Sequence, residues 1–169
     1  LRGGKILRLL VCGAKGQVGR ELTALSGAAG VEIIGLDRTQ LDISNPNQIS
    51  TCLDRIMPDA LLNAAAYTAV DKAESDADAA HLINGAAPGY LAKAAAERKL
   101  PFLHISTDFV FDGTKNGAYV ETDSCNPLSV YGASKHAGEL AVQKANPQHI
   151  ILRTAWVFGG ATNFVNTMR

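Results

Sequence analysis

The chain has 169 residues with 16 basic and 16 acidic side chains, so its formal net charge is zero at neutral pH. This length suits one domain of ordinary size with a single apolar core. The charge balance argues against binding to nucleic acid or to an anionic membrane surface, and no apolar run approaches the ~20 residues that span a bilayer.

Short apolar runs alternate with segments of helical spacing along the chain. Runs that predict buried strands lie at residues 6–11, 31–36, 60–62, 102–105 and 149–153. Segments that predict helices lie at residues 18–25, 47–57, 73–99 and 134–144. Because buried strands that alternate with helices form parallel sheets covered on both faces, we predict a doubly wound α/β fold of the Rossmann type. Gly85 and the pair Pro88-Gly89 are expected to bend or divide the third helix.

Three glycines stand between the first predicted strand and the first predicted helix. Gly13, Gly16 and Gly19 form a G-x-x-G-x-x-G pattern. Glycine lets the backbone turn tightly and approach a pyrophosphate, whose charge the helix N-terminus then stabilises. We therefore predict that this loop, with Gln17 and Val18, binds a dinucleotide. A tight turn without a ligand is the alternative.

Asp37 and Arg38 follow the second predicted strand. An acidic residue at this point usually hydrogen-bonds the ribose hydroxyls of NAD, whereas an arginine accommodates the 2′-phosphate of NADP. The adjacent pair leaves NAD and NADP open, with a slight preference for NADP or for the use of both.

Thr107 and Asp108 follow the fourth predicted strand. Open α/β sheets place their ligands at the carboxyl ends of strands, where a threonine hydroxyl can donate to a developing alkoxide. We therefore predict that Thr107 is a hydrogen-bond donor to a carbonyl substrate. The alternative is that the two residues cap a helix or turn.

Tyr131 and Lys135 form a Y-x-x-x-K pair. Residues four apart on a helix stand on the same face, one turn from each other. A tyrosine normally titrates near pKa ~10, and a nearby lysine cation favours the phenolate and lowers that value. The pair predicts an acid/base for a carbonyl/alcohol couple, the partner reaction to hydride transfer. For this spacing alone, a surface helix with an unrelated tyrosine and lysine is the alternative.

The three cysteines, Cys12, Cys52 and Cys125, are widely spaced and form no C-x-x-C or histidine-linked pattern. Such cysteines are typical of reduced thiols in a cytosolic protein. We therefore expect a cytoplasmic protein without a signal peptide, and we assign no role to Cys125.

Five sequence strings occur in one order along the chain, at residues 13–19, 63–74, 106–113, 131–135 and 153–158. This series resembles the extended short-chain dehydrogenase/reductases, and within them the dTDP-4-dehydrorhamnose reductases. The resemblance runs from about Ile6 to Arg169. It implies an NAD(P)H-dependent reduction of the 4-keto group of dTDP-4-dehydro-L-rhamnose to dTDP-L-rhamnose, a precursor of cell-surface polysaccharide.

The resemblance also implies roles for individual residues. Tyr131 would donate the proton to the carbonyl oxygen, Lys135 would hold the nicotinamide ribose and lower the pKa of Tyr131, and Thr107 would orient the carbonyl. Asp108 and Trp156 would contact the sugar, unless Trp156 belongs to the core. The residues implied in adenine and dinucleotide binding are Asp42, Ile43, Ala65, Ala66, Tyr67 and Thr68.

Two positions bear on how far the resemblance extends. Phe109 stands where the family commonly has tyrosine, so a hydroxyl contact is lost there. Glu21 matches a position that in some members helps bind Mg²⁺ between subunits. Its usual partner carboxylates would lie beyond Arg169, so we expect a surface glutamate and no metal. The sequence leaves open whether the protein forms a homodimer.

The resemblance predicts how the chain is divided. We expect residues 1–155 to form a dinucleotide-binding domain, and residues 156–169 to begin a substrate-binding region that is largely absent. A nucleotide sugar is the expected partner. The 169 residues by themselves should bind a dinucleotide with little or no turnover, because the reaction geometry needs the sugar held as well.

Two other functions are compatible with the same strings. A non-catalytic, NADP-binding regulatory subunit of methionine adenosyltransferase resembles the same reductases, and it can keep the Thr107, Tyr131 and Lys135 constellation. A reductase or epimerase of another nucleotide sugar is the second alternative, because the substrate-binding region decides which sugar binds.

Overall fold

Residues 6–159, which the computed structural model describes, are built around a five-stranded parallel sheet. The strands lie in the order β2-β1-β3-β4-β5. They are β1 (Leu7–Cys12), β2 (Val31–Leu36), β3 (Ala60–Asn63), β4 (Phe102–Thr107) and β5 (His149–Thr154). The five predicted strands are confirmed. From β1 the sheet grows in both directions, and open α/β sheets bind their ligands at the carboxyl ends of the strands beside such a switch point.

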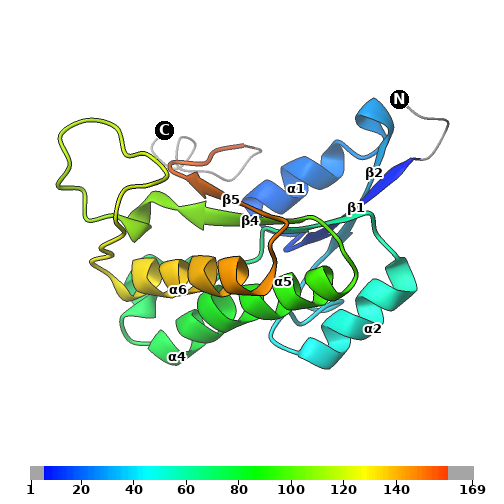
Figure 1. Cartoon of the computed structure of the whole chain (residues 1–169), viewed down its shortest axis with the longest axis horizontal. Coiled ribbons are helices and arrows are strands. Elements are labelled where there is room, and N and C mark those ends of the chain that lie inside the picture. Colours follow the sequence, from blue (N-terminus) through cyan, green and yellow to red (C-terminus); the bar gives the residue numbers. More distant parts are fainter. Residues whose placement is uncertain (1–5, 160–169) are drawn as a thin grey trace.

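Helices cover both faces of the sheet, as the predicted doubly wound fold requires. α2 (Pro46–Ile56), α5 (Ala87–Glu97) and α6 (Val130–Ala145) lie against one face, and α1 (Gln17–Ala24) lies on the other, beside β1 and β2 (Figure 1). The shorter elements are η1 (Ala28–Gly30), α3 (Val70–Ala73), α4 (Ala77–Ala80), η2 (His81–Ala86) and η3 (Asp108–Val110). Within residues 6–159, none of the helices combines the length and the apolar character needed to cross a membrane.

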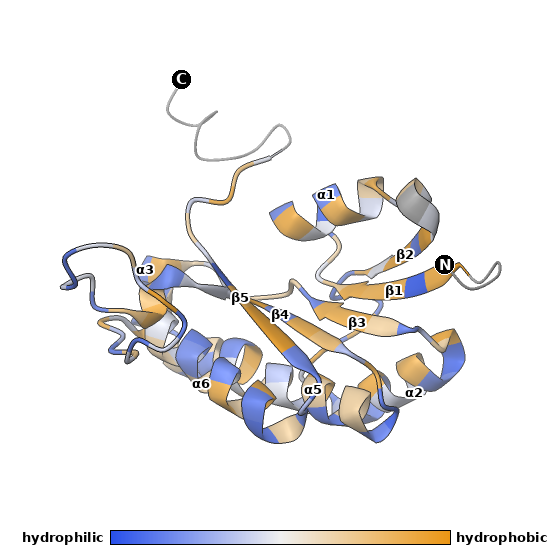
Figure 2. Ribbon diagram, turned by 45° about the horizontal axis from the view of Figure 1, so that its top comes forward, coloured by the Kyte–Doolittle hydropathy of each residue, from blue (hydrophilic) through white to orange (hydrophobic). Residues whose placement is uncertain are grey.

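The apolar core lies between the sheet and the layer of α2, α5 and α6. The strand register places Leu10, Leu61 and Phe102 side by side across β1, β3 and β4, and each is at most 1% exposed. Leu53 from α2 and Leu91 from α5 belong to the same buried cluster. Figure 2 shows the hydrophobic colour along these strands. Burial of each such side chain contributes roughly 1.5–3 kcal/mol to the stability of the fold. This packing fixes the carboxyl ends of the strands at one edge of the sheet.

The third predicted helix is divided, as Gly85 and Pro88 led us to expect. The chain passes from α4 into η2, which is a π-helix, and Pro88 then lies in the first turn of α5. A π turn widens the helix locally and is frequent at functional sites. α6 packs closely against η2 at Gly138. A Cβ atom at this position would overlap the carbonyl oxygen of Asn84, so only glycine fits there.

Candidate functional site

The carboxyl ends of β1, β3, β4 and β5 open into one cavity of about 630 Å³. This volume lies within the ~300–1,000 Å³ range of small-molecule sites. Its lining contains every residue that the sequence predicts for cofactor, substrate or catalysis, except Gly19. Those residues are Gly13, Gly16, Gln17, Val18, Asp37, Arg38, Asp42, Ile43, Ala65, Ala66, Tyr67, Thr68, Thr107, Asp108, Tyr131, Lys135 and Trp156.

The glycine loop is shaped for close approach between backbone segments. Gly13 has a φ of 85°, and its N–H and that of Ala14 both donate to the carbonyl oxygen of Leu36 at 2.9 and 3.0 Å. A Cβ atom at Gly13 would lie 2.6 Å from the backbone nitrogen of Ala65, the second residue after β3, which lines the same cavity. Glycine is required there by both conformation and space.

Gly19 does not line the cavity, and its predicted contact with the cofactor stays a prediction. It is buried in α1, where a Cβ atom would overlap the carbonyl oxygen of Gly13. The third glycine of such loops allows the helix to pack closely on the strand and turn before it. Its role is therefore to seat α1 against the loop.

The end of β2 carries a cluster of charges. Lys15 Nζ lies 2.5 Å from Asp37 Oδ2, while the backbone N–H and the hydroxyl of Thr39 donate to Asp37 Oδ1 at 2.7 and 2.6 Å. The hydrogen bond from Lys15, followed by those from Thr39, lowers the pKa of Asp37. Lys15 pairs with the Asp37 carboxylate, and Arg38 interacts with the Asp42 carboxylate at the same cavity wall. Lysine and arginine side chains in such a position can hold a phosphate group.

Asn84 is a site residue that the sequence analysis missed. Its side-chain oxygen accepts from the N–H of Tyr67 at 2.8 Å, and its Nδ2 donates to the carbonyl oxygen of Tyr67 and to Ser134 Oγ, both at 3.0 Å. Asn84 is 1% exposed and lies in the π-helix η2. It therefore fastens the loop after β3 to the helix that carries Tyr131 and Lys135. An asparagine beside Gly85 in an alanine-rich segment was the available signal.

Thr107, Tyr131 and Lys135 meet at the end of β4. The Thr107 side chain hydrogen-bonds with the Tyr131 phenol, and the Phe109 ring packs edge-on against the Tyr131 ring at 5.6 Å. Lys135 Nζ donates to the carbonyl oxygen of Ile105 at 2.6 Å. α6 begins at Val130, four residues before the predicted start, because the Ser129 hydroxyl caps it by accepting from the Gly132 N–H.

The acid/base pair titrates differently from the prediction. Burial raises the pKa of Tyr131, the Thr107 hydrogen bond opposes that rise, and the nearby Asp108 carboxylate adds to it. The expectation that Lys135 lowers the pKa of Tyr131 is therefore wrong for this structure, since the ammonium is directed at the Ile105 carbonyl. Burial also lowers the pKa of Lys135 to about 8, although the Glu139 carboxylate acts to raise it.

Thr107, Trp156 and Phe109 lie at the cavity wall near Tyr131. Thr107 caps η3 by accepting from the Phe109 N–H, and its hydroxyl donates to Asp108 Oδ1 at 3.1 Å. The predicted cap is therefore present, and Thr107 also lines the cavity; its role as a donor to a substrate stays a prediction. Trp156 is 73% exposed, which excludes it from the core, and its φ of 52° turns the chain at the cavity wall. Phe109 is half-exposed at the same wall.

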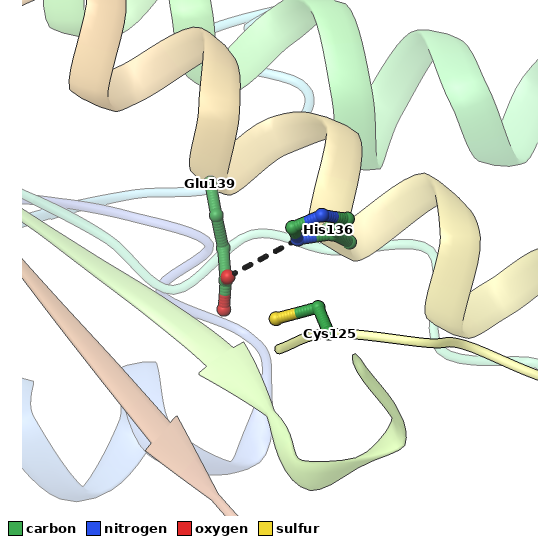
Figure 3. Close-up of side chains that lie close together, drawn as sticks. All are labelled: Cys125, His136 and Glu139. Carbon is green, nitrogen blue, oxygen red and sulfur yellow. Dashed lines mark ion pairs between the residues drawn. The ribbon is translucent and has the colours of Figure 1, made fainter. Parts of the chain in front are cut away.

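Metal-ligating side chains gather in one place within residues 6–159, away from Glu21. Cys125, His136 and Glu139 offer ligand atoms within 4.8 Å of one another (Figure 3). Arg153 Nη2 lies 2.7 Å from Glu139 Oε2 and 3.2 Å from Cys125 Sγ, so a metal cation there would meet a guanidinium. All three cysteines are free thiols.

Comparison with known proteins identifies the family. The family model described as the RmlD substrate binding domain matches residues 7–169. The chain belongs to this family. The matched region of the RmlD substrate binding domain family contains the whole cavity described above, from the glycine loop to Trp156.

Relatives in sequence and in structure agree with this assignment. The dTDP-4-dehydrorhamnose reductase of Aggregatibacter actinomycetemcomitans is 47% identical over 163 residues, a match that covers 95% of this chain. A dTDP-4-dehydrorhamnose reductase structure from Clostridium acetobutylicum has a TM-score of 0.91 at 42% identity, and it covers 96% of this chain and 58% of that one. A Bacillus anthracis structure of the same name, in complex with NADP, has a TM-score of 0.94 at 35% identity and covers 98% and 60%. The chain spans 55% of the length of the Aggregatibacter protein.

Proposed function

We propose that this chain is the cofactor-binding and acid/base part of a dTDP-4-dehydrorhamnose reductase, which reduces the 4-keto group of dTDP-4-dehydro-L-rhamnose with NADPH or NADH. The observation that carries the proposal is the meeting of Thr107, Tyr131 and Lys135 in one cavity with the glycine loop. The names of the relatives support the choice of sugar nucleotide. The three free thiols also support a cytoplasmic location.

The residues of the cavity fit a nicotinamide dinucleotide. Gly13, Gly16 and Gln17 line the cavity directly before and at the N-terminus of α1, which suits a pyrophosphate. Asp42 and Ile43 would flank the adenine, and Lys135 would hold the nicotinamide ribose. The cofactor, when bound, supplies the hydride.

Tyr131 is suited to donate the proton. Because its pKa is raised, the phenol keeps its proton at neutral pH and can give it to the carbonyl oxygen as that oxygen gains negative charge. The Thr107 hydroxyl, which donates to Asp108 Oδ1 in this structure, would turn to become a second donor to the same oxygen.

The charges at the end of β2 support NADP without excluding NAD. Lys15 and Arg38 are two cations at this wall that can hold a 2′-phosphate, beside the carboxylates of Asp37 and Asp42. The Asp37 carboxylate is also placed to accept from a ribose hydroxyl once Lys15 moves away. The NADP complex of the Bacillus anthracis relative supports the first arrangement.

The assay uses the protein expressed from its full reading frame, dTDP-4-dehydro-L-rhamnose, and either NADPH or NADH. We expect dTDP-L-rhamnose as the product, and turnover slower by about 10²–10⁴-fold in Tyr131→Phe, which keeps the ring and loses the proton. NADPH binding without turnover, together with co-purification with methionine adenosyltransferase, would instead establish the regulatory subunit. Turnover of a different nucleotide sugar alone would overturn the choice of substrate.

A further inference from the structure

A buried ion pair joins the acid/base helix to the last strand of the sheet. Arg153 Nε donates to Glu139 Oε1 at 2.9 Å, and its Nη2 donates to Oε2 at 2.7 Å. The Glu139 side chain is 1% exposed. Two parallel hydrogen bonds between a planar guanidinium and a carboxylate fix the relative position of both groups. The pair therefore sets where α6 lies along β5.

Each partner lies next to residues of the proposed active site. Glu139 follows Lys135 by one helical turn and Tyr131 by two, so the three side chains share one face of α6. On β5, Arg153 precedes Thr154, whose hydroxyl donates to the carbonyl oxygen of Ser106 at 3.1 Å. The connection thus runs from the acid/base helix through the ion pair to the end of β4, directly before Thr107.

The guanidinium itself is held from three sides. Besides Glu139 it contacts Cys125 Sγ at 3.2 Å, and it lies over the Phe111 ring with its carbon 4.9 Å from the ring centre. His136 Nδ1 lies 3.5 Å from Glu139 Oε2 (Figure 3). Arg153 therefore provides the cation of this cluster, and the loop before α6 is tied to the same point.

The groups that face Glu139 explain its charge. Burial acts to raise the pKa of Glu139, but its two hydrogen bonds from Arg153 lower it overall. Burial raises the pKa of the Cys125 thiol, so the thiol adds no charge at neutral pH. The carboxylate is then the negative group that raises the pKa of the buried Lys135, against the stronger effect of burial. Glu121 is the further carboxylate that acts on Arg153.

We propose that Glu139, paired with Arg153, is a positioning residue for the reaction: it holds α6 in register on β4 and β5 and places a carboxylate one helical turn from Lys135. This inference rests on the proposed function. The pair is a buried ion pair of the kind that specifies one register between packed elements.

The test is the pH dependence of turnover in full-length protein. Activity that needs the Lys135 ammonium is lost as pH rises through the pKa of that group. Glu139→Gln keeps the shape of the side chain and removes its charge. We therefore expect the loss of activity at high pH, the basic limb of the pH–rate profile, to move to lower pH, and kcat to fall roughly 10- to 100-fold. Glu139→Asp, which keeps the charge, should retain the wild-type limb. Asp54→Asn, which breaks the exposed Arg98–Asp54 pair between α2 and the end of α5, is the matched control.

A second variant covers the case in which Glu139→Gln does not fold. The double variant Glu139→Met/Arg153→Met replaces both buried charges with apolar groups, an exchange that proteins often tolerate. We expect the same shift of the basic limb in the folded double variant. A wild-type limb and wild-type kcat in either folded variant would overturn the proposal.

The titration of Lys135 can also be followed without turnover. In protein with ¹³C-labelled lysine, the NMR signal that is missing in Lys135→Met reports the pKa of Lys135 directly. That pKa should fall in Glu139→Gln and stay unchanged in Asp54→Asn. If the wild type shows no reductase activity, the proposed function fails while this measurement still decides the role of Glu139. An unchanged pKa in Glu139→Gln would contradict that role.

Discussion

Lys135 Nζ donates a hydrogen bond of 2.6 Å to the carbonyl oxygen of Ile105, two residues before Thr107 on β4. Lys135 is only 2% exposed, so its ammonium group is buried in the protein and is not hydrated by solvent. Such burial disfavours the charged form and explains why the pKa of Lys135 is lowered to about 8. The buried ammonium of Lys135 therefore lowers the free energy of unfolding of the protein.

Lys135→Met should separate stability from activity. Because the folded pKa lies below the ordinary value of 10.5, the unfolded chain binds more protons between pH 8 and 10.5, and the free energy of unfolding rises with pH over that window. Below pH 8 the buried ammonium is a full cost. Removing it should stabilise the protein by about 1–2 kcal/mol at pH 7, after the lost hydrogen bond to Ile105 is subtracted, and should abolish turnover.

Urea unfolding of Lys135→Met and wild type at pH 7 and pH 10 checks this result. The stability gain should shrink at the higher pH, where the wild-type lysine is neutral in the folded protein. Lys93→Met, at an exposed position of α5, is the control and should show no such pH-dependent gain. A stability loss of equal size at both pH values would contradict the expected effect of burial.

Thr107→Val tests the second donor to the carbonyl oxygen. Valine keeps the shape but loses the hydroxyl, so we expect kcat to fall by about 10²–10³-fold, the usual effect of removing one such donor. Thr107→Ser keeps the hydroxyl and should restore most of the activity. Because the hydroxyl also accepts from the Phe109 N–H, stability should fall by about 1 kcal/mol in the valine variant alone.

Steady-state kinetics and NADPH titration together check the role of Thr107. The affinity for NADPH should be the same in both variants and in wild type. A valine variant with wild-type kcat would show that the residue serves only as the cap of η3.

Much of this site could be predicted from the sequence because its parts lie in continuous strings. Gly13, Asp37, Thr107 and Tyr131 each follow a strand or begin a helix, and the parallel sheet brings all strand ends to one edge. The strands themselves were predictable because each is a short apolar run. Position along the chain was enough to place these residues in one cavity.

The features that escaped prediction depend on contacts between distant segments. Asn84 acts through Tyr67 and Ser134, the latter 50 residues away, and its place beside Gly85 does not show which residues it contacts. The pKa of Tyr131 was predicted with the wrong direction, because spacing shows the nearby lysine and not the burial that dominates. The close packing of Gly19 on the turn at Gly13 is a further contact that spacing alone does not show.

Gly19→Ala tests that packing role. The added methyl group would overlap the Gly13 carbonyl oxygen, so α1 must move, and we expect a stability loss of about 1–3 kcal/mol with weaker NADPH binding. At Gly16 the φ is −70° and a Cβ atom would lie 3.2 Å from the same oxygen. Gly16→Ala is therefore the matched control, with a smaller stability loss in thermal unfolding. Equal losses for both would contradict the specific contact at Gly19.

Lys15→Ala and Arg38→Ala test the preference between the two dinucleotides. If the two cations hold a 2′-phosphate, each change should weaken NADPH binding by roughly tenfold, the effect of one hydrogen bond to a charged group, and leave NADH binding nearly unchanged. Asp37→Asn should act in the opposite direction, because it removes the carboxylate that Lys15 now neutralises and that a ribose hydroxyl would need. Fluorescence titrations with both dinucleotides measure these affinities. Equal weakening of NADPH and NADH in Arg38→Ala would show that Arg38 contacts a part common to both, and not the 2′-phosphate.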